Sequence, residues 1–121
     1  MAPSAAAFLL VVSAACATAQ AADPERGKAL YESRCTGCHS LDQDRVGPRH
    51  RGVVGRKAGA VAGFEYSPAL RASRIVWSTQ TLDAWLAGPE RLIPGQRMNY
   101  SVPDAADRAA LIAYLEANSG P

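Results

Sequence analysis

A five-residue run, Cys35-Thr36-Gly37-Cys38-His39, constrains this chain more than any other feature. Two thiols separated by two residues can form thioethers with the two vinyl groups of one porphyrin, and the next residue, a histidine, can then ligate the iron. A thioredoxin-like dithiol has the same spacing, but it gives the histidine no role and lies in a βαβ pattern that is absent here. A structural zinc site needs two further ligands at similar spacing, and only Cys16 and His50 remain. The run therefore predicts covalent attachment of one c-type haem through Cys35 and Cys38, with His39 as an axial iron ligand.

The first 21 residues predict an export signal. They contain no charged side chain, and the short apolar core Phe8-Leu9-Leu10-Val11-Val12 is followed by small residues. This core is much shorter than the roughly 20 residues that span a bilayer, so we expect no stable membrane insertion. We expect residues 1–21 to be a cleaved signal peptide and residues 22–121 to form one domain. The alternative is a lipid anchor on Cys16, but Ser13 stands where such a motif prefers leucine.

Export and haem attachment both place the mature chain in the periplasm or an equivalent compartment. Because haem uses both cysteines that follow the signal, no structural disulfide is available. The formal net charge is only +2, and the basic residues are scattered along the chain. Nucleic acid is not expected as a partner, because it would require a clustered basic face.

Capping residues and apolar spacing predict an all-α domain with long connections. Residues 41–63 contain frequent glycines and no convincing alternation of apolar and polar residues, which predicts a loop and no strand of more than a couple of residues. The expected helices begin at Asp23-Pro24, at Ser67-Pro68, at Ser78 or Thr79, and near Pro103-Asp104. Gly88-Pro89 should end the third of these helices, and the last should stop by Gly120. Such long connections need something large to wrap, and a haem suits that role.

The second axial position of the iron stays open on the residues alone. Met98 follows the turn Pro94-Gly95, and a thioether favours reduced iron. A lone methionine after a turn is nevertheless more often part of a core. The candidates are Met98, His50 or no ligand.

Taken together, several short segments resemble the small class I cytochromes c, the soluble mitochondrial type and its bacterial relatives. The resemblance runs from Gly27-Lys28 to Ala113-Tyr114-Leu115, and order and spacing agree apart from small deletions. The segments are Cys35–His39, Gly47-Pro48, Gly55-Arg56-Lys57, Gly63-Phe64-Glu65-Tyr66-Ser67, Ile75-Val76-Trp77, Ile93-Pro94-Gly95-Gln96-Arg97-Met98 and Leu111-Ile112-Ala113-Tyr114-Leu115. The resemblance implies the small cytochrome c fold, a few helices and long loops around one covalent haem, with Met98 as the sixth ligand.

The resemblance also implies roles for individual residues. The carbonyl of Pro48 should accept the N–H of the His39 ring, and Gly27 should lie where the first and last helices touch. Three side chains, those of Arg56, Tyr66 and Trp77, should bind a buried haem propionate directly or through water. Ser67 should keep the hydroxyl of a family threonine beside them.

Other positions depart from the family and alter the haem surroundings. Trp85 replaces a tyrosine near the methionine ligand, Gln96 replaces a threonine, and Leu70 replaces an asparagine. His50 stands where an aliphatic residue is usual, and we expect it to be a hydrogen-bonded or partly exposed histidine. Only Lys28 and Lys57 remain of a lysine ring around the haem edge, which arginines replace in part.

With both axial positions filled, the expected function is one-electron transfer without catalysis. We expect a monomer that meets its redox donor and acceptor in small, transient contacts. The alternatives are an electron-transfer subunit of a periplasmic dehydrogenase or oxidase complex and, less favoured, a ligand-binding or peroxidase-like haem protein.

Overall fold

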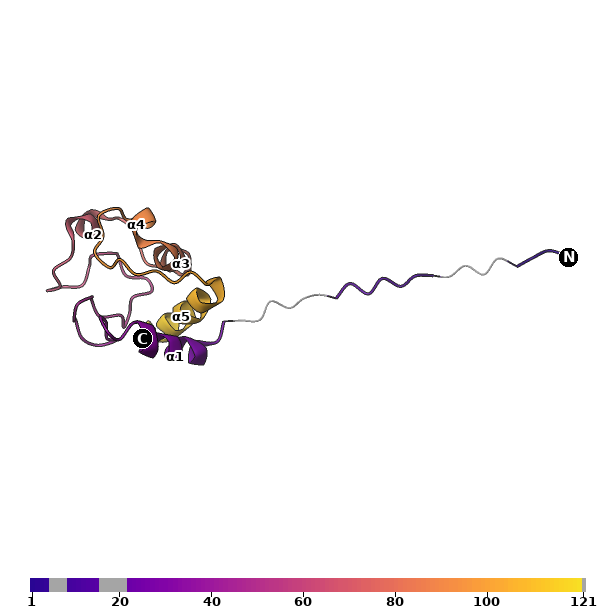
Figure 1. Ribbon diagram of the computed structural model, residues 1–121, viewed down its shortest axis with the longest axis horizontal. Coiled ribbons are helices and arrows are strands. Elements are labelled where there is room, and N and C mark those ends of the chain that lie inside the picture. Colours follow the sequence, from indigo (N-terminus) through magenta and orange to yellow (C-terminus); the bar gives the residue numbers. More distant parts are fainter. Residues whose placement is uncertain (5–8, 16–21, 121) are drawn as a thin grey trace.

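The computed structural model describes residues 1–4, 9–15 and 22–120 (Figure 1). The described part of the chain forms helices joined by loops, and its only β-type pairing is an isolated bridge between Lys57 and Val76. The helices are α1 (Pro24–Arg34), α2 (Pro68–Ala72), α3 (Thr79–Ala87), α4 (Pro89–Leu92) and α5 (Ala105–Ala117). The all-α prediction is therefore confirmed.

Residues 9–15 lie apart from the folded domain, and the side chains of Leu9, Leu10, Val11 and Val12 are exposed there (Figure 1). The predicted signal peptide includes residues outside the described ranges, and the lipid-anchor alternative at Cys16 lies wholly outside them. Among the described residues, no helix has both the length and the apolar character that a membrane crossing requires.

Side chains at the helix starts explain where the helices begin. Asp23 accepts a hydrogen bond from the amide of Glu25, and Asp104 accepts one from the amide of Asp107. The Ser78 hydroxyl accepts the amide of Thr81, whose own hydroxyl accepts the amide of Ser78, which completes a capping box. These starts confirm the sequence predictions. The sequence prediction missed α4, because Gly88-Pro89 both ends α3 and begins the next helix with Pro89 in its first turn.

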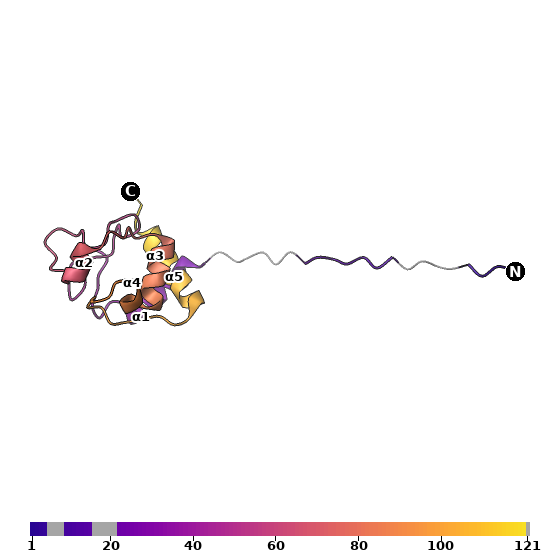
Figure 2. The same ribbon diagram turned by 90° about the horizontal axis from the view of Figure 1, so that it is seen from above.

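Helices α1 and α5 cross in close contact, and this contact organises the domain (Figures 1 and 2). A Cβ at Gly27 would lie 1.9 Å from the carbonyl oxygen of Ala110, so only a glycine allows the two backbones to approach this closely. Tyr31 of α1 and the α5 side chains Leu111 and Leu115 are buried beside the crossing. This confirms the close helix contact that the resemblance implied.

In both views α2 lies at the far end of the domain from the crossing of α1 and α5 (Figures 1 and 2). The long connection over residues 35–67 runs between these two ends. Backbone hydrogen bonds hold it in place, from Gly52 N–H to the carbonyl of Asn118 (3.1 Å) and from Gly55 N–H to that of Trp77 (2.7 Å). The connection is thus fastened to the end of α5 and to the segment that precedes α3.

Candidate haem-binding site

The paired thiols lie on a tight turn at the end of α1. Cys35 is the C-cap of the helix, and its carbonyl accepts the amides of both Cys38 (3.1 Å) and His39 (2.9 Å). The Cys35 thiol is partly buried and the Cys38 thiol is exposed, and neither forms a disulfide. Burial raises the pKa of the Cys35 thiol to about 11. The turn therefore presents two free thiols and one imidazole from five consecutive residues.

The ring of His39 is held in the state that an iron ligand requires. Its Nδ1 lies 2.9 Å from the carbonyl oxygen of Pro48. A carbonyl can only accept, so Nδ1 carries the hydrogen and Nε2 keeps a lone pair for the metal. His39 is buried, and this burial lowers its pKa and favours the neutral ring.

Gly47 makes room for this ring. A Cβ at that position would lie 2.1 Å from Cε1 of His39 and 2.6 Å from both ring nitrogens. The Gly47 amide donates to the carbonyl of Cys38 (2.9 Å), which ties the loop to the cysteine turn. The sequence pair Gly47-Pro48 therefore supplies both the space for the imidazole and its hydrogen-bond acceptor.

The ring of His50 stacks on the ring of His39, with centroids 4.0 Å apart and planes inclined by 22°. Its Nδ1 lies 2.9 Å from the hydroxyl of Tyr31, so the histidine is hydrogen-bonded as expected. Burial lowers the pKa of His50 well below its ordinary value, and the nearby His39 and Arg56 add to this effect. A ring stacked beside the proximal ligand is poorly placed to bind the iron from the opposite side, which disfavours His50 as the sixth ligand.

Two of the side chains proposed for a buried propionate, those of the neighbouring residues Tyr66 and Ser67, keep hydrogens to donate. Tyr66 is buried, and its hydroxyl oxygen accepts the amide of Val61 (3.0 Å), which leaves its own hydrogen free. The Ser67 hydroxyl likewise accepts the amide of Leu70 (3.1 Å) at the start of α2. Because a buried carboxylate is costly unless it accepts hydrogen bonds, these unused donors suit a propionate.

Arg56 and Trp77 are the other two residues that the resemblance assigns to the propionate. The Trp77 amide donates to the carbonyl of Arg56 (2.9 Å), and the buried Trp77 ring packs beside Trp85 with centroids 5.3 Å apart. Arg56 donates to the carbonyl of Arg49 (2.6 Å); its burial lowers its pKa, and the nearby Tyr66 partly opposes that. The group therefore offers one cation and several neutral donors.

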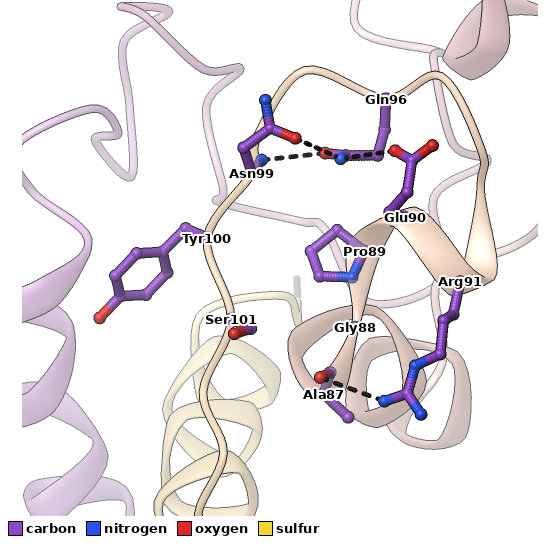
Figure 3. A pocket seen from close by; sticks show the side chains of 9 residues that line it. All are labelled: Ala87, Gly88, Pro89, Glu90, Arg91, Gln96, Asn99, Tyr100 and Ser101. Carbon is purple, nitrogen blue, oxygen red and sulfur yellow. Dashed lines mark hydrogen bonds between the residues drawn. The ribbon is translucent and has the colours of Figure 1, made fainter.

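Met98 is partly buried on the segment between α4 and α5. A polar network fastens this segment beside a pocket that residues 87–91, 96 and 99–101 line (Figure 3). The Glu90 carboxylate accepts the amide of Gly95 and the side-chain amide of Gln96, both at 3.0 Å. These bonds lower the pKa of Glu90. The sequence marked Gln96 as unusual but gave no sign of its partners.

The turn with two thiols, the oriented imidazole and the donor group define a covalent c-type haem site in an all-α domain. Comparisons with known proteins agree. The profile of the family described as Cytochrome c matches residues 24–119. The chain is 41% identical to Cytochrome c 2.1 of Caenorhabditis elegans, over 82% of this chain and 92% of that protein. It is also 41% identical to Cytochrome c2 of Rhodopila globiformis, over 78% and 92%.

A solved structure, cytochrome cH from Methylobacterium extorquens, superimposes with a TM-score of 0.75 at 35% identity. The superposition covers 78% of this chain and 98% of the cytochrome cH chain. The chain belongs to the cytochrome c family, of the small class I type. It carries one covalently bound c-type haem and is a small haem electron carrier that exchanges electrons with redox partners.

Proposed function

We propose that the mature protein is a periplasmic one-electron carrier whose iron is ligated by His39 and Met98. The observation that carries the proposal is the hydrogen bond of His39 Nδ1 to Pro48, because it leaves Nε2 as the only ring nitrogen able to bind iron. The bound haem supplies the one-electron couple of iron. The chain's own residues hold that iron, orient its ligands and exclude water from it.

Two strong axial ligands favour electron transfer over catalysis. If His39 and Met98 both bind the iron of the haem, no position would be open to a substrate, so we propose that the protein is not an enzyme. Met98 lies on a segment that hydrogen bonds fix at Gly95 and Asn99, on either side of it. A thioether ligand also raises the reduction potential, which suits an electron carrier.

The remaining side chains are proposed to surround the haem. Cys35 and Cys38 form the thioethers, and Pro48 orients the proximal ring. Arg56, Tyr66, Ser67 and Trp77 bind a propionate with their cationic or unused donor groups, and Trp85 packs against Trp77 near the methionine side.

The domain layout supports export. We propose that residues 1–21 are a cleaved signal peptide and that residues 22–121 are the mature domain, acting as a monomer in transient contact with its donor and acceptor. Mass spectrometry of the mature chain should show an N-terminus between Gln20 and Asp23 and the added mass of one haem. A lipid-modified N-terminal Cys16 would contradict this arrangement.

The Met98→Ala variant tests the ligation. The wild-type ferrous protein should bind carbon monoxide slowly, because Met98 must first leave the iron. The variant should bind it quickly, and its potential should fall by a few hundred millivolts, a plausible part of the roughly 0.8 V over which axial ligation and surroundings tune haems. Fast binding by the wild type together with an unchanged potential in the variant would refute the proposal and favour a ligand-binding haem protein.

A further inference from the structure

Four hydrogen bonds fasten the segment that carries Met98, and all four involve side chains of Glu90, Gln96 or Asn99. Figure 3 draws the bonds that join these three residues to one another. Gln96 Nε2 donates to Glu90 Oε2 (3.0 Å) and to Asn99 Oδ1 (2.7 Å). Gln96 Oε1 accepts the backbone amide of Asn99 (3.0 Å), and Glu90 Oε1 accepts that of Gly95 (3.0 Å). We call these three side chains the Glu90–Gln96–Asn99 clamp.

The clamp closes directly around the methionine. Its two bonds between Gln96 and Asn99 join the residues on either side of Arg97-Met98, so this dipeptide is the span of a closed ring. Asn99 has a positive φ of 47°, a conformation that asparagine tolerates better than most residues. The clamp therefore fixes the backbone at a conformation that an unrestrained segment would adopt less often.

Burial makes the clamp costly to open. Gln96 is only 6% exposed. Both hydrogens and the oxygen of its side-chain amide form hydrogen bonds within the clamp. Opening it would leave polar atoms unpaired in a buried place. Glu90 belongs to α4, whose first residue Pro89 is buried, so the clamp is anchored to a helix.

We propose that Glu90, Gln96 and Asn99 are positioning residues that hold Met98 on the iron and slow its replacement by outside ligands; this inference rests on the proposed ligation by Met98. The clamp acts through the backbone of the segment, at residues on either side of Met98. Its removal should therefore change how fast the methionine leaves more than it changes the overall fold.

The first measurement is the rate at which imidazole binds the ferric holoprotein, in stopped flow at saturating imidazole, where departure of the methionine limits the rate. Gln96→Leu keeps a side chain of similar size but removes three of the four bonds, and Glu90→Ala removes the other anchor from an exposed position. Both variants should react about tenfold faster than wild type, which corresponds to about 1.4 kcal/mol. Glu90→Gln keeps an acceptor for only one of its two donors, the Gly95 amide or Gln96 Nε2, so its rate should lie between those of the wild type and Glu90→Ala.

Glu116→Gln is the matched control, since this exposed carboxylate lies in the last turn of α5 and has no side-chain hydrogen bond within the described chain. It should react at the wild-type rate.

Amide hydrogen exchange gives a second readout that is independent of ligand binding. Glu90→Ala should speed exchange of the Gly95 amide more than that of Asn99, and Gln96→Leu should do the reverse, because each variant removes a different acceptor.

The outcomes separate the two proposals. If Met98→Ala binds imidazole no faster than wild type, Met98 does not occupy the site and the proposed ligation fails. If Met98→Ala is fast while Gln96→Leu and Glu90→Ala both keep the wild-type rate, the ligation holds and the clamp is overturned. Failure of Gln96→Leu to fold leaves Glu90→Ala and its exchange pattern to decide.

Discussion

The contact at Gly27 allows the sharpest stability prediction. For Gly27→Ala, helix propensity and packing predict changes of opposite sign in the free energy of unfolding. In an exposed helix interior, Gly27→Ala would stabilise the protein by about 1 kcal/mol. In this structure the new Cβ would lie 1.9 Å from the carbonyl oxygen of Ala110 and 2.9 Å from Cβ of Tyr114. Ordinary contacts of a Cβ begin near 3.4 Å, so the backbone of α5 would have to move away from α1.

This movement cannot be relieved by rotating a side chain, because the nearest atoms belong to the backbone of a helix that Leu111 and Leu115 anchor in the core. Overpacking of this kind costs about 1–3 kcal/mol, and the backbone clash places Gly27→Ala at the upper end. After the gain in helix propensity, we expect a net loss of about 2 kcal/mol. For a domain of this size, that lowers Tm by about 8–16 °C.

Thermal unfolding of the haem-loaded protein, followed by circular dichroism, measures this loss. Gly120→Ala is the control, because no atom lies within 4 Å of its added Cβ and its φ is not in the left-handed region. The control should change the free energy of unfolding by no more than about 0.5 kcal/mol. A Gly27→Ala protein as stable as wild type, or more stable, would refute the packing argument and show that helix propensity determines the effect of this substitution.

Two further predictions concern the proximal side. Burial raises the pKa of the Tyr31 hydroxyl far above its ordinary 10.0, so the stabilisation from the neutral hydroxyl is complete below pH 10.0 and is lost as the pH rises toward the raised value. Above pH 10.0 the wild type should therefore lose stability more steeply than Tyr31→Phe, whereas the control Tyr100→Phe, at a 42% exposed position, should follow the wild type; parallel curves for all three would contradict this. Gly47→Ala places a Cβ 2.1 Å from the His39 ring and should lower the yield of low-spin haem protein in absorption spectra, while Gly120→Ala, with no atom within 4 Å, should not. Equal yields of haem protein from the two variants would show that the loop can move to accommodate the added Cβ, and would contradict this prediction.

Local chemistry explains which parts of the fold the sequence predicted. A side chain such as Asp23, Ser78 or Asp104 caps a helix through residues two or three positions away, so its effect can be inferred without tertiary structure. Helix α4 was missed because Gly88-Pro89 carries a stop signal and a start signal in the same two residues. A four-residue helix leaves no apolar period that could have revealed it.

The functional site likewise has features that a local sequence pattern predicts and features that depend on the tertiary structure. The Cys35–His39 run carries the haem prediction because five consecutive residues supply both thiols and the first ligand. Only the resemblance predicted the role of Gly27, because the contact that requires a glycine there is with the backbone of Ala110, far along the chain. The stacking of His50 on His39 and the bond between Glu90 and Gln96 depend on how loops pass one another, which no local pattern encodes.

The central claim, an electron carrier with His39 and Met98 on the iron, can be tested by X-ray absorption at the iron edge of the ferric protein at neutral pH. The account predicts a sulfur atom in the first shell of the wild type, beside the porphyrin and histidine nitrogens, and its loss in Met98→Ala. A wild-type shell made only of light atoms, or a sulfur signal that survives Met98→Ala, would contradict the account.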